Sequence, residues 1–345
     1  MNKFFRNIFI LITSFILLSA ISIISVLWTY SNDLPDYKFL KSYKPPVSSK
    51  VYSGNGDLVA DFSQEKRVFV PFNSIPKNVI NAFLSAEDKN FFKHPGVDAK
   101  GVIRAVINNI SNILSSKRLE GASTITQQVA KNFLLTNEVS LNRKIKEAIL
   151  AFRIERALSK ERILELYLNQ IYLGSGAYGV AAASLEYFDK SIKDLNYSEA
   201  ALLAALPKAP SRYNPYRDPD IAKFRRNLVL KNLLDNNYLT SEWYEKLTKE
   251  EIILKKNKKI YLEDAQYFIE DVRKSVIETL SYDKVYKQGF NINTPIDLNL
   301  QTIATKSLRD GLIAYDKRKG WRGPLTNKIY NSEWKKDLEK YKLEN

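Results

Sequence analysis

The sequence predicts a mainly helical protein, in which one N-terminal hydrophobic helix precedes a helical domain with a small α+β region on either side. Three observations support this fold class. Residues 8–30 form an uncharged apolar run, residues 74 to about 245 show the apolar spacing of helices, and short strand-like segments flank them. With 345 residues, 45% of them hydrophobic, the chain can bury a sizeable core. We expect segments at 1–31, 32–73, 74–245 and 246–345.

The apolar run at 8–30 predicts a membrane anchor, because it is as long as the ~20 residues that cross a bilayer. Lys3 and Arg6 precede it, and Trp28 and Tyr30 lie at its far edge. This pattern predicts a cytoplasmic N-terminus and an external remainder. A cleaved signal peptide is the competing interpretation, but no convincing cleavage site follows the run.

The chain is basic and has no cysteine. Its 53 Lys and Arg against 38 Asp and Glu give a formal net charge of +15. This excess favours an acidic lipid, a phosphorylated substrate or nucleic acid as partner, although a compositional drift toward Lys explains it equally well. An external, membrane-held domain argues against nucleic acid. The lack of cysteine excludes disulfides, zinc–thiolate sites and a cysteine nucleophile.

Short β segments are expected on both sides of the helical domain. Apolar residues within 51–60 flank the turn sequence Gly-Asn-Gly-Asp at 54–57, which is typical of a β-hairpin. Residues 290–294 are strand-like and lie in a Lys-rich, mixed region.

The segment 87–96, EDKNFFKHPG, begins with two carboxylates at the end of a predicted helix. Ile80, Phe83 and Leu84 mark the buried face of that helix, and Glu87 falls on the same stripe at i+7. Partial burial disfavours the charged form of a carboxyl and raises its pKa, which suits a proton-transfer group. A paired structural glutamate is the alternative. His94 is the only histidine, so a transition-metal site is not expected.

The segment 121–128, GASTITQQ, combines hydroxyl and amide side chains and is followed by Lys131 and Asn132. Such groups can hydrogen-bond sugar hydroxyls and phosphate oxygens. A capped helix start with Ser123 as the N-cap is the structural interpretation, and the two are compatible.

Residues 143–155 predict a basic helix in which Arg143 and Lys144 lie one turn before Glu147. Exposed ion pairs of this kind contribute little to the stability of the fold, but the same cations could equally hold a pyrophosphate. The predicted apolar stripe of this helix is Ile145, Ala148, Ile149 and Phe152.

The apolar face at 103–114, closed by Lys117 and Arg118, fits core packing and an interfacial helix in lipid equally well. Further helices are expected to begin after Ser159 and, in a capping box with Glu199, after Asn196.

Together these segments resemble the peptidoglycan glycosyltransferase domain of class A penicillin-binding proteins of the 1A type. The resemblance covers about 70–245 and implies a lysozyme-like, two-lobed domain on the outer side of the cell inner membrane. Residues 260–323 resemble the linker before a transpeptidase domain. The resemblance rests on five ordered motifs, at 87–96, 121–128, 143–155, 160–169 (KERILELYLN) and 200–210 (ALLAALPKAP).

The resemblance also implies the chemistry. The substrate would be lipid II, and the growing glycan strand, membrane lipid and cell-wall synthesis proteins would be the partners. Glu87 matches the general base that deprotonates the acceptor's 4-hydroxyl, and Glu147 matches the glutamate that assists the leaving pyrophosphate. No cofactor is required, although Mg²⁺ or Mn²⁺ could accompany the pyrophosphate. The positions that match substrate-binding residues are Asp88, His94, Ser123, Thr124, Gln127, Gln128, Lys131, Asn132, Arg143 and Lys144.

Two features depart from the family pattern. Many relatives carry a basic residue where this chain has Val139, which is expected to weaken phosphate binding. Ser74 and Lys77 match the Ser-x-x-Lys motif, but no Lys-Thr-Gly follows, and Ser74 is expected only to cap a helix with Pro76 in its first turn. Penicillin acylation is therefore not expected, and the chain would be truncated, a split gene product or a damaged copy.

Two alternatives to glycan polymerisation stay open. A lysozyme-like hydrolase would use the same carboxylates for cleavage, although the cationic helix suits a pyrophosphate better than a neutral glycan. An inactive anchored fragment is the second alternative, motivated by the missing transpeptidase motifs.

Overall fold

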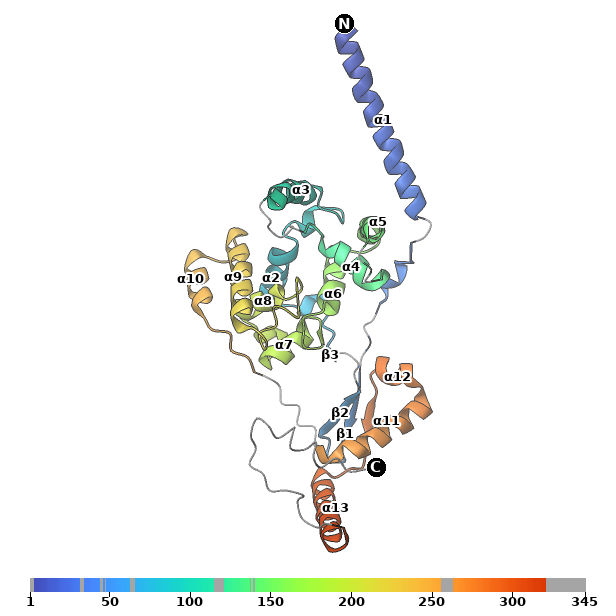
Figure 1. The fold of residues 1–345 in the computed structure, drawn as a ribbon, viewed down its shortest axis with the longest axis vertical. Helices are drawn as coiled ribbons and strands as arrows, with labels where there is room; N and C mark the ends of the chain where they lie inside the picture. The colour runs from blue at the N-terminus through green and yellow to red at the C-terminus, as the bar shows by residue number, and fades with distance from the viewer. Residues whose placement is uncertain are drawn as a thin grey trace, which may run out of the picture. The chain divides into compact units, whose positions relative to one another are not determined.

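The computed structural model describes residues 3–31, 34–43, 46, 48–62, 66–114, 121–136, 138, 140–255 and 263–320. The described residues are mainly helical, which confirms the predicted class (Figure 1). The chain divides into two compact units. The first comprises residues 1–49, 62–259 and 280–290, and the second comprises 50–61, 260–279 and 291–345.

Helix α1 (Lys3–Ser31) covers the predicted anchor. The C-terminal end of α1 contacts helix α5 (Leu141–Ala157) through two hydrogen bonds. Tyr30 donates to Asn142 Oδ1 at 2.7 Å, and Arg153 donates to Ser31. Within the described part of the chain, no helix is long and apolar enough to cross a membrane. The anchor at 8–30 therefore stays a prediction.

Two groups of helices build the core of the first unit. Helix α8 (Tyr197–Ala205) packs against α2 (Lys77–Glu87) and α9 (Pro219–Asp235), and α4 (Ile125–Leu134) packs against α5 and α6 (Lys160–Gln170) (Figure 1). One hydrophobic cluster runs through both groups. The other helices of this unit are α3 (Ala99–Leu114), α7 (Val180–Phe188), α10 (Ser241–Lys249), α12 (Tyr282–Lys287), and the 3-10 helices η1 (Lys38–Lys41), η2 (Phe72–Ser74), η3 (Phe91–Lys93) and η4 (Ile192–Asp194).

The predicted capping chemistry is confirmed at two helix starts, those of α6 and α8, but not at the start of α2. Ser159 accepts a hydrogen bond from a backbone N–H, and Asn196 and Glu199 form both halves of a capping box. The predicted cap at Ser74 is wrong, because Ser74 ends a 3-10 helix and α2 begins at Lys77. Pro76 disfavours a helical conformation in the residue before it, so the helix cannot extend back to Ser74.

The second unit contains the predicted hairpin. Strands β1 (Ser49–Tyr52) and β2 (Leu58–Phe62) are neighbours, and the Ser53 N–H donates to Asp57 O across the turn at 2.8 Å. Strand β5 (Asn291–Asn293) pairs with β1 in parallel, which confirms the strand-like segment near 290–294. The second unit also contains the 3-10 helix η5 (Glu263–Ala265), helix α13 (Leu298–Lys319) and all but the last residue of helix α11 (Gln266–Leu280). In the first unit, the short strands β3 (Lys66–Arg67) and β4 (Ala177–Tyr178) pair in parallel.

Helix α3 exposes its apolar face. Ile103 is 61% exposed and Ile107 63%, with Val106 and Ile110 similarly accessible. The core-packing interpretation is therefore wrong for these residues. The side chains of Ile113 and Leu114 lie outside the described set.

The predicted buried stripe of α5 is largely wrong. The inner face consists of Glu147, Leu150, Ala151 and Ile154, at i, i+3, i+4 and i+7. Ile149 is also buried, but Phe152 is 44% exposed. The helix carries two apolar stripes, and packing against α4 and α6 selects the one that contains Glu147.

Candidate active site

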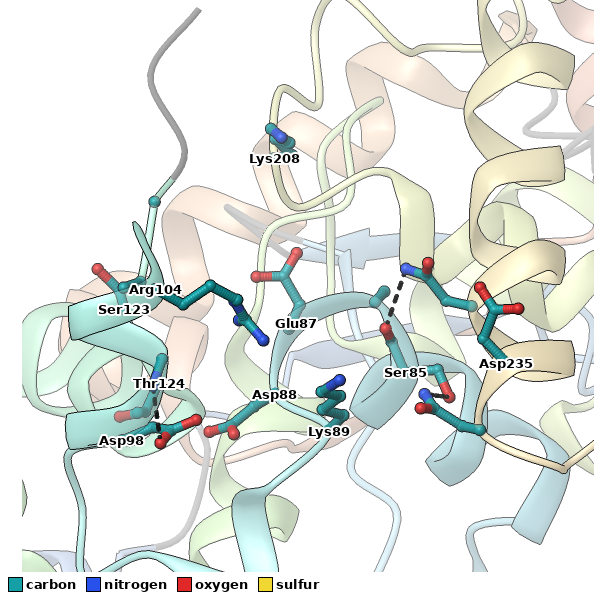
Figure 2. A pocket seen from close by; sticks show the side chains of 16 residues that line it. Ser85, Glu87, Asp88, Lys89, Asp98, Arg104, Ser123, Thr124, Lys208 and Asp235 are labelled. Carbon is teal, nitrogen blue, oxygen red and sulfur yellow. Dashed lines mark hydrogen bonds between the residues drawn. The ribbon is translucent and has the colours of Figure 1, made fainter. Parts of the chain in front are cut away.

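Glu87 is the last residue of α2 and lies in a pocket of about 370 Å³. In Figure 2 its carboxyl group lies between Arg104 of α3 and Ser85 of α2. The segment 121–124 forms part of the wall, and residues from the end of α9 line the pocket as well. These segments are far apart in the sequence. Packing of α2 against α9 brings two of them together, and a hydrogen bond from the Ile125 N–H to Asp88 holds the start of α4 beside α2.

The Glu87 carboxyl is partly buried, and its Oε2 accepts a hydrogen bond from Gln128 Nε2 at 2.8 Å. Burial raises the pKa of Glu87, and the nearby charge of Asp88 raises it further. The hydrogen bond from Gln128 and the positive charges of Lys208 and Arg225 act in the opposite direction on this pKa. The result is a carboxyl group suited to accept a proton near neutral pH.

Asp88 connects three segments behind the pocket. His94 Nε2 lies 3.0 Å from both carboxylate oxygens, and the backbone N–H of Ile125 donates to Oδ2 at 3.0 Å. The Gly96 N–H donates to His94 Nδ1, so the ring proton is on Nε2 and a neutral imidazole satisfies both contacts. Asp88 lines the pocket, whereas His94 is buried outside it.

Gly96 allows the loop to approach α5 closely. Its φ is +104°, in the region that favours glycine, and a Cβ there would lie 2.8 Å from the backbone of Ala151. This position fixes the loop that carries His94 against the helix that carries Glu147.

The N-cap of α4 is Thr124, so the expected cap at Ser123 is wrong. Thr124 Oγ1 accepts from the Gln127 N–H at 3.2 Å, and Gln127 Oε1 accepts from the Thr124 N–H at 2.9 Å. Both residues are strong caps, but only Thr124 has a Gln at N3, which completes a capping box. Thr124 contributes to the pocket wall, whereas Gln127 is used by the helix start and does not line the pocket.

Ser123, which does not cap the helix, lines the pocket and accepts a hydrogen bond from Lys144 Nζ at 3.0 Å. Lys144 also pairs with Glu147 Oε2 at 2.5 Å, and Arg143 Nε lies 3.0 Å from Oε1. Glu147 is 1% exposed, so the exposed ion-pair interpretation is wrong. Glu147 itself does not line the pocket. Lys144 links it to the pocket wall.

The other predicted binding positions lie further away. Lys131 is half-buried and Asn132 is exposed on α4, and neither lines the pocket that contains Glu87. Val139 lies outside the described residues.

Sequence reasoning missed several pocket residues. Lys208 belongs to the motif at 200–210, where it looked like part of a helix end. Arg104 is a single cation on the amphipathic α3, and nothing in its local sequence distinguishes it. Lys89 belongs to the segment 87–96 but was not predicted to be a site residue. Only tertiary packing identifies Ser85, Asp98, Asn232, Asp235 and Asn236.

The described residues contain no group of three His, Cys, Asp or Glu side chains that could hold a metal ion. Both oxygens of Glu147 face cationic side chains, which does not suit a divalent cation. Any Mg²⁺ or Mn²⁺ here would depend on oxygens of a diphosphate ligand.

Comparison with known proteins gives consistent matches. The model of the Transglycosylase family matches residues 55–234. The chain is 49% identical over 316 residues to Penicillin-binding protein 1A of Rickettsia felis, covering 91% of this chain and 40% of that protein. It is 49% identical over 283 residues to Penicillin-binding protein 1A of Aquifex aeolicus, covering 82% of this chain and 38% of that protein.

Among solved structures, the chain is similar to the 2.6 Å crystal structure of Penicillin-Binding Protein 1A from Haemophilus influenzae. The TM-score is 0.52 at 28% sequence identity, and the match covers 88% of this chain and 35% of that one. The chain thus spans about 40% of the length of the curated relatives that it matches.

Proposed function

The chain belongs to the transglycosylase family, and on this premise we propose that it polymerises lipid II into β-1,4-linked glycan strands and releases undecaprenyl pyrophosphate. One observation carries the proposal. A partly buried carboxyl, Glu87, stands in a pocket lined by polar and cationic side chains, with a raised pKa and a donor from Gln128.

Glu87 acts as the general base. Its carboxylate takes the proton of the acceptor sugar's 4-hydroxyl, and that oxygen attacks the donor's anomeric carbon from the face opposite the leaving group. The bond between the anomeric carbon and the pyrophosphate oxygen breaks, and its electron pair leaves with the pyrophosphate. The donor's α linkage thereby becomes a β-1,4 linkage.

The leaving pyrophosphate requires positive charge, which Arg143, Lys144 and Lys131 supply. Glu147 holds two of these cations at fixed positions, because its buried carboxylate contacts both Arg143 and Lys144. Lys144 also contacts Ser123 in the pocket wall, so the group that binds phosphate is adjacent to the sugar site. We assign direct substrate contacts to Asp88, Ser123, Gln128 and Asn132, and a positioning role to His94, Thr124 and Gln127.

The location follows from the substrate, which is embedded in the bilayer by its undecaprenyl chain. The proposed arrangement has α1 as a single-pass anchor in the cell inner membrane, a cytoplasmic N-terminus and the catalytic domain outside. The exposed apolar face of α3 supports this location, because such a face is stable at a lipid interface.

Incubation with labelled lipid II tests the proposal. The parent protein should yield long glycan chains and free undecaprenyl pyrophosphate. Glu87→Gln should lose about a hundredfold or more of this rate, since it removes the base. The matched control Glu161→Gln, at an exposed helix start, should polymerise like the parent.

Three outcomes would contradict the proposal or a part of it. Equal polymerisation by Glu87→Gln and the parent would reject the base, and digestion of finished peptidoglycan without use of lipid II would identify a hydrolase. Unchanged lipid II, under conditions in which a relative is active, would indicate an inactive fragment.

A further inference from the structure

A second cleft lies on the surface of the first unit. It has a volume of about 490 Å³ and is formed by residues 92–95 and the C-terminal half of α5. The proposed polymerisation mechanism gives no role to six of the side chains that line it, which are Phe92, Lys93, Phe152, Glu155, Arg156 and Lys160.

Lys160 and Glu155 form one wall of the cleft and pair with each other. Lys160 Nζ lies 2.8 Å from Glu155 Oε1, and their side chains are 20% and 8% exposed. Thr126 also donates to Glu155, and Lys160 donates to the His94 carbonyl at 2.7 Å. The Glu155 carboxylate is therefore neutralised and held in place.

Two cations of the cleft have no such partner. Lys93 and Arg156 are exposed, and neither side chain makes a hydrogen bond or ion pair with the described residues. Phe92 and Phe152, which also line the cleft, are 53% and 44% exposed. The cleft thus combines free positive charge with exposed aromatic rings, which fits a ligand with an anionic head and an apolar body.

The outer face of α5 leads into this cleft. Leu141 is 77% exposed, and the half-buried Ile145 and Ala148 continue the same stripe to Phe152 and then, one turn on, to Arg156. This is most of the stripe that the sequence suggested would be buried. Contacts of α1 with both ends of α5, at Asn142 and Arg153, hold this helix beside the end of the proposed anchor.

We propose that this cleft binds the headgroup of an anionic phospholipid from the surrounding bilayer. Lys93 and Arg156 contact the lipid phosphate, Arg156 through its planar guanidinium. Phe92 and Phe152 lie at the level of the first acyl carbons, where aromatic side chains are favoured. The inference rests on the proposed membrane location, and it assigns a structural lipid that is separate from the substrate. A soluble phosphate would satisfy the cations but would leave both rings in water.

Photo-crosslinking of the full chain in lipid nanodiscs tests this site. The probes are photoactivatable phosphatidylglycerol and, in parallel, phosphatidylcholine, and the adducts are mapped by peptide mass spectrometry. Phosphatidylglycerol should label peptides that contain residues 92–95 and 152–156 more strongly than phosphatidylcholine does. In the double variant Lys93→Gln/Arg156→Gln, the ratio of labelling by phosphatidylglycerol to labelling by phosphatidylcholine should fall about fivefold for each cation removed. The control Lys193→Gln/Arg217→Gln removes two other exposed cations of the same unit and should keep the preference.

Equal labelling by both lipids, or a preference that survives the Lys93/Arg156 variant, would overturn the inference. Matching melting temperatures for the two double variants would exclude a folding defect. Labelling requires no catalysis, so the two proposals fail separately. Loss of the lipid preference in a protein that still polymerises lipid II rejects only the cleft, and the reverse result rejects only the enzymatic proposal.

Discussion

Glu87 connects stability with activity through a single carboxyl group. Its pKa is raised in the folded protein, so folding favours the protonated form. The stability that this group contributes is fully present at low pH and is lost as the pH rises through the raised pKa. Glu87→Gln should therefore unfold at a temperature equal to or above the parent's at pH 7, with the difference vanishing in acid. Thermal unfolding over pH 4–8 measures this, and a Gln variant that is less stable at pH 7 would contradict it.

Gln128 has the opposite effect on the same carboxyl, because its amide donates to the charged form. Gln128→Leu should raise the pKa of Glu87 further, so the acidic limb of kcat/KM for lipid II should move to higher pH. At pH 7 we expect kcat/KM to fall about tenfold, because the free energy of one hydrogen bond to a charged group corresponds to a factor of this size. Gln266→Leu, at an exposed position of α11 in the second unit, is the control for the general effect of leucine. An unshifted acidic limb would show that this hydrogen bond does not set the protonation of Glu87.

At the scale of elements, the start of α4 separates a structural hydroxyl from a functional one. Thr124 closes the capping box, so Thr124→Ala should lower the free energy of unfolding by about 1 kcal/mol. Ser123 makes no cap and contacts Lys144 in the pocket wall, so Ser123→Ala should keep the parent's stability and lose polymerisation rate. Urea denaturation and the lipid II assay, applied to both variants, distinguish the two roles. Equal stability losses would contradict this assignment.

The existence of the helices could be predicted from sequence, because apolar spacing and capping residues act locally. Which side of each helix is buried could not always be predicted. Helix α5 carries two apolar stripes, and contacts with distant helices select the one that contains Glu147. Likewise, the motifs identified Glu87 and Gln128, but the pocket wall around Asn232 and Arg104 depends on packing between segments more than a hundred residues apart. The proposed lipid cleft also combines two segments, around Phe92 and Phe152, that only the fold brings together.

At the scale of the whole molecule, the exposed face of α3 bears on where the enzyme works. Ile103 and Ile107 are more than half exposed on one side of this helix, and Arg104, on the same helix, lines the pocket with Glu87. If this face enters the bilayer, α3 holds the pocket at the depth of the lipid diphosphate. Ile103→Glu/Ile107→Glu should then reduce polymerisation in vesicles by about tenfold or more, because two apolar side chains lose their lipid environment.

Detergent micelles provide the contrast that makes this test specific. Lipid II in micelles can reach the pocket without a bilayer, so the same double variant should polymerise there at close to the parent's rate. Leu300→Glu/Ile303→Glu makes the same change on the exposed face of α13, in the second unit, and should leave the vesicle rate unchanged. An equal loss in vesicles and micelles would place the defect of the α3 variant in the pocket itself. A vesicle rate like the parent's would show that α3 does not dock on lipid, and only the proposed anchor would then hold the catalytic domain at its substrate.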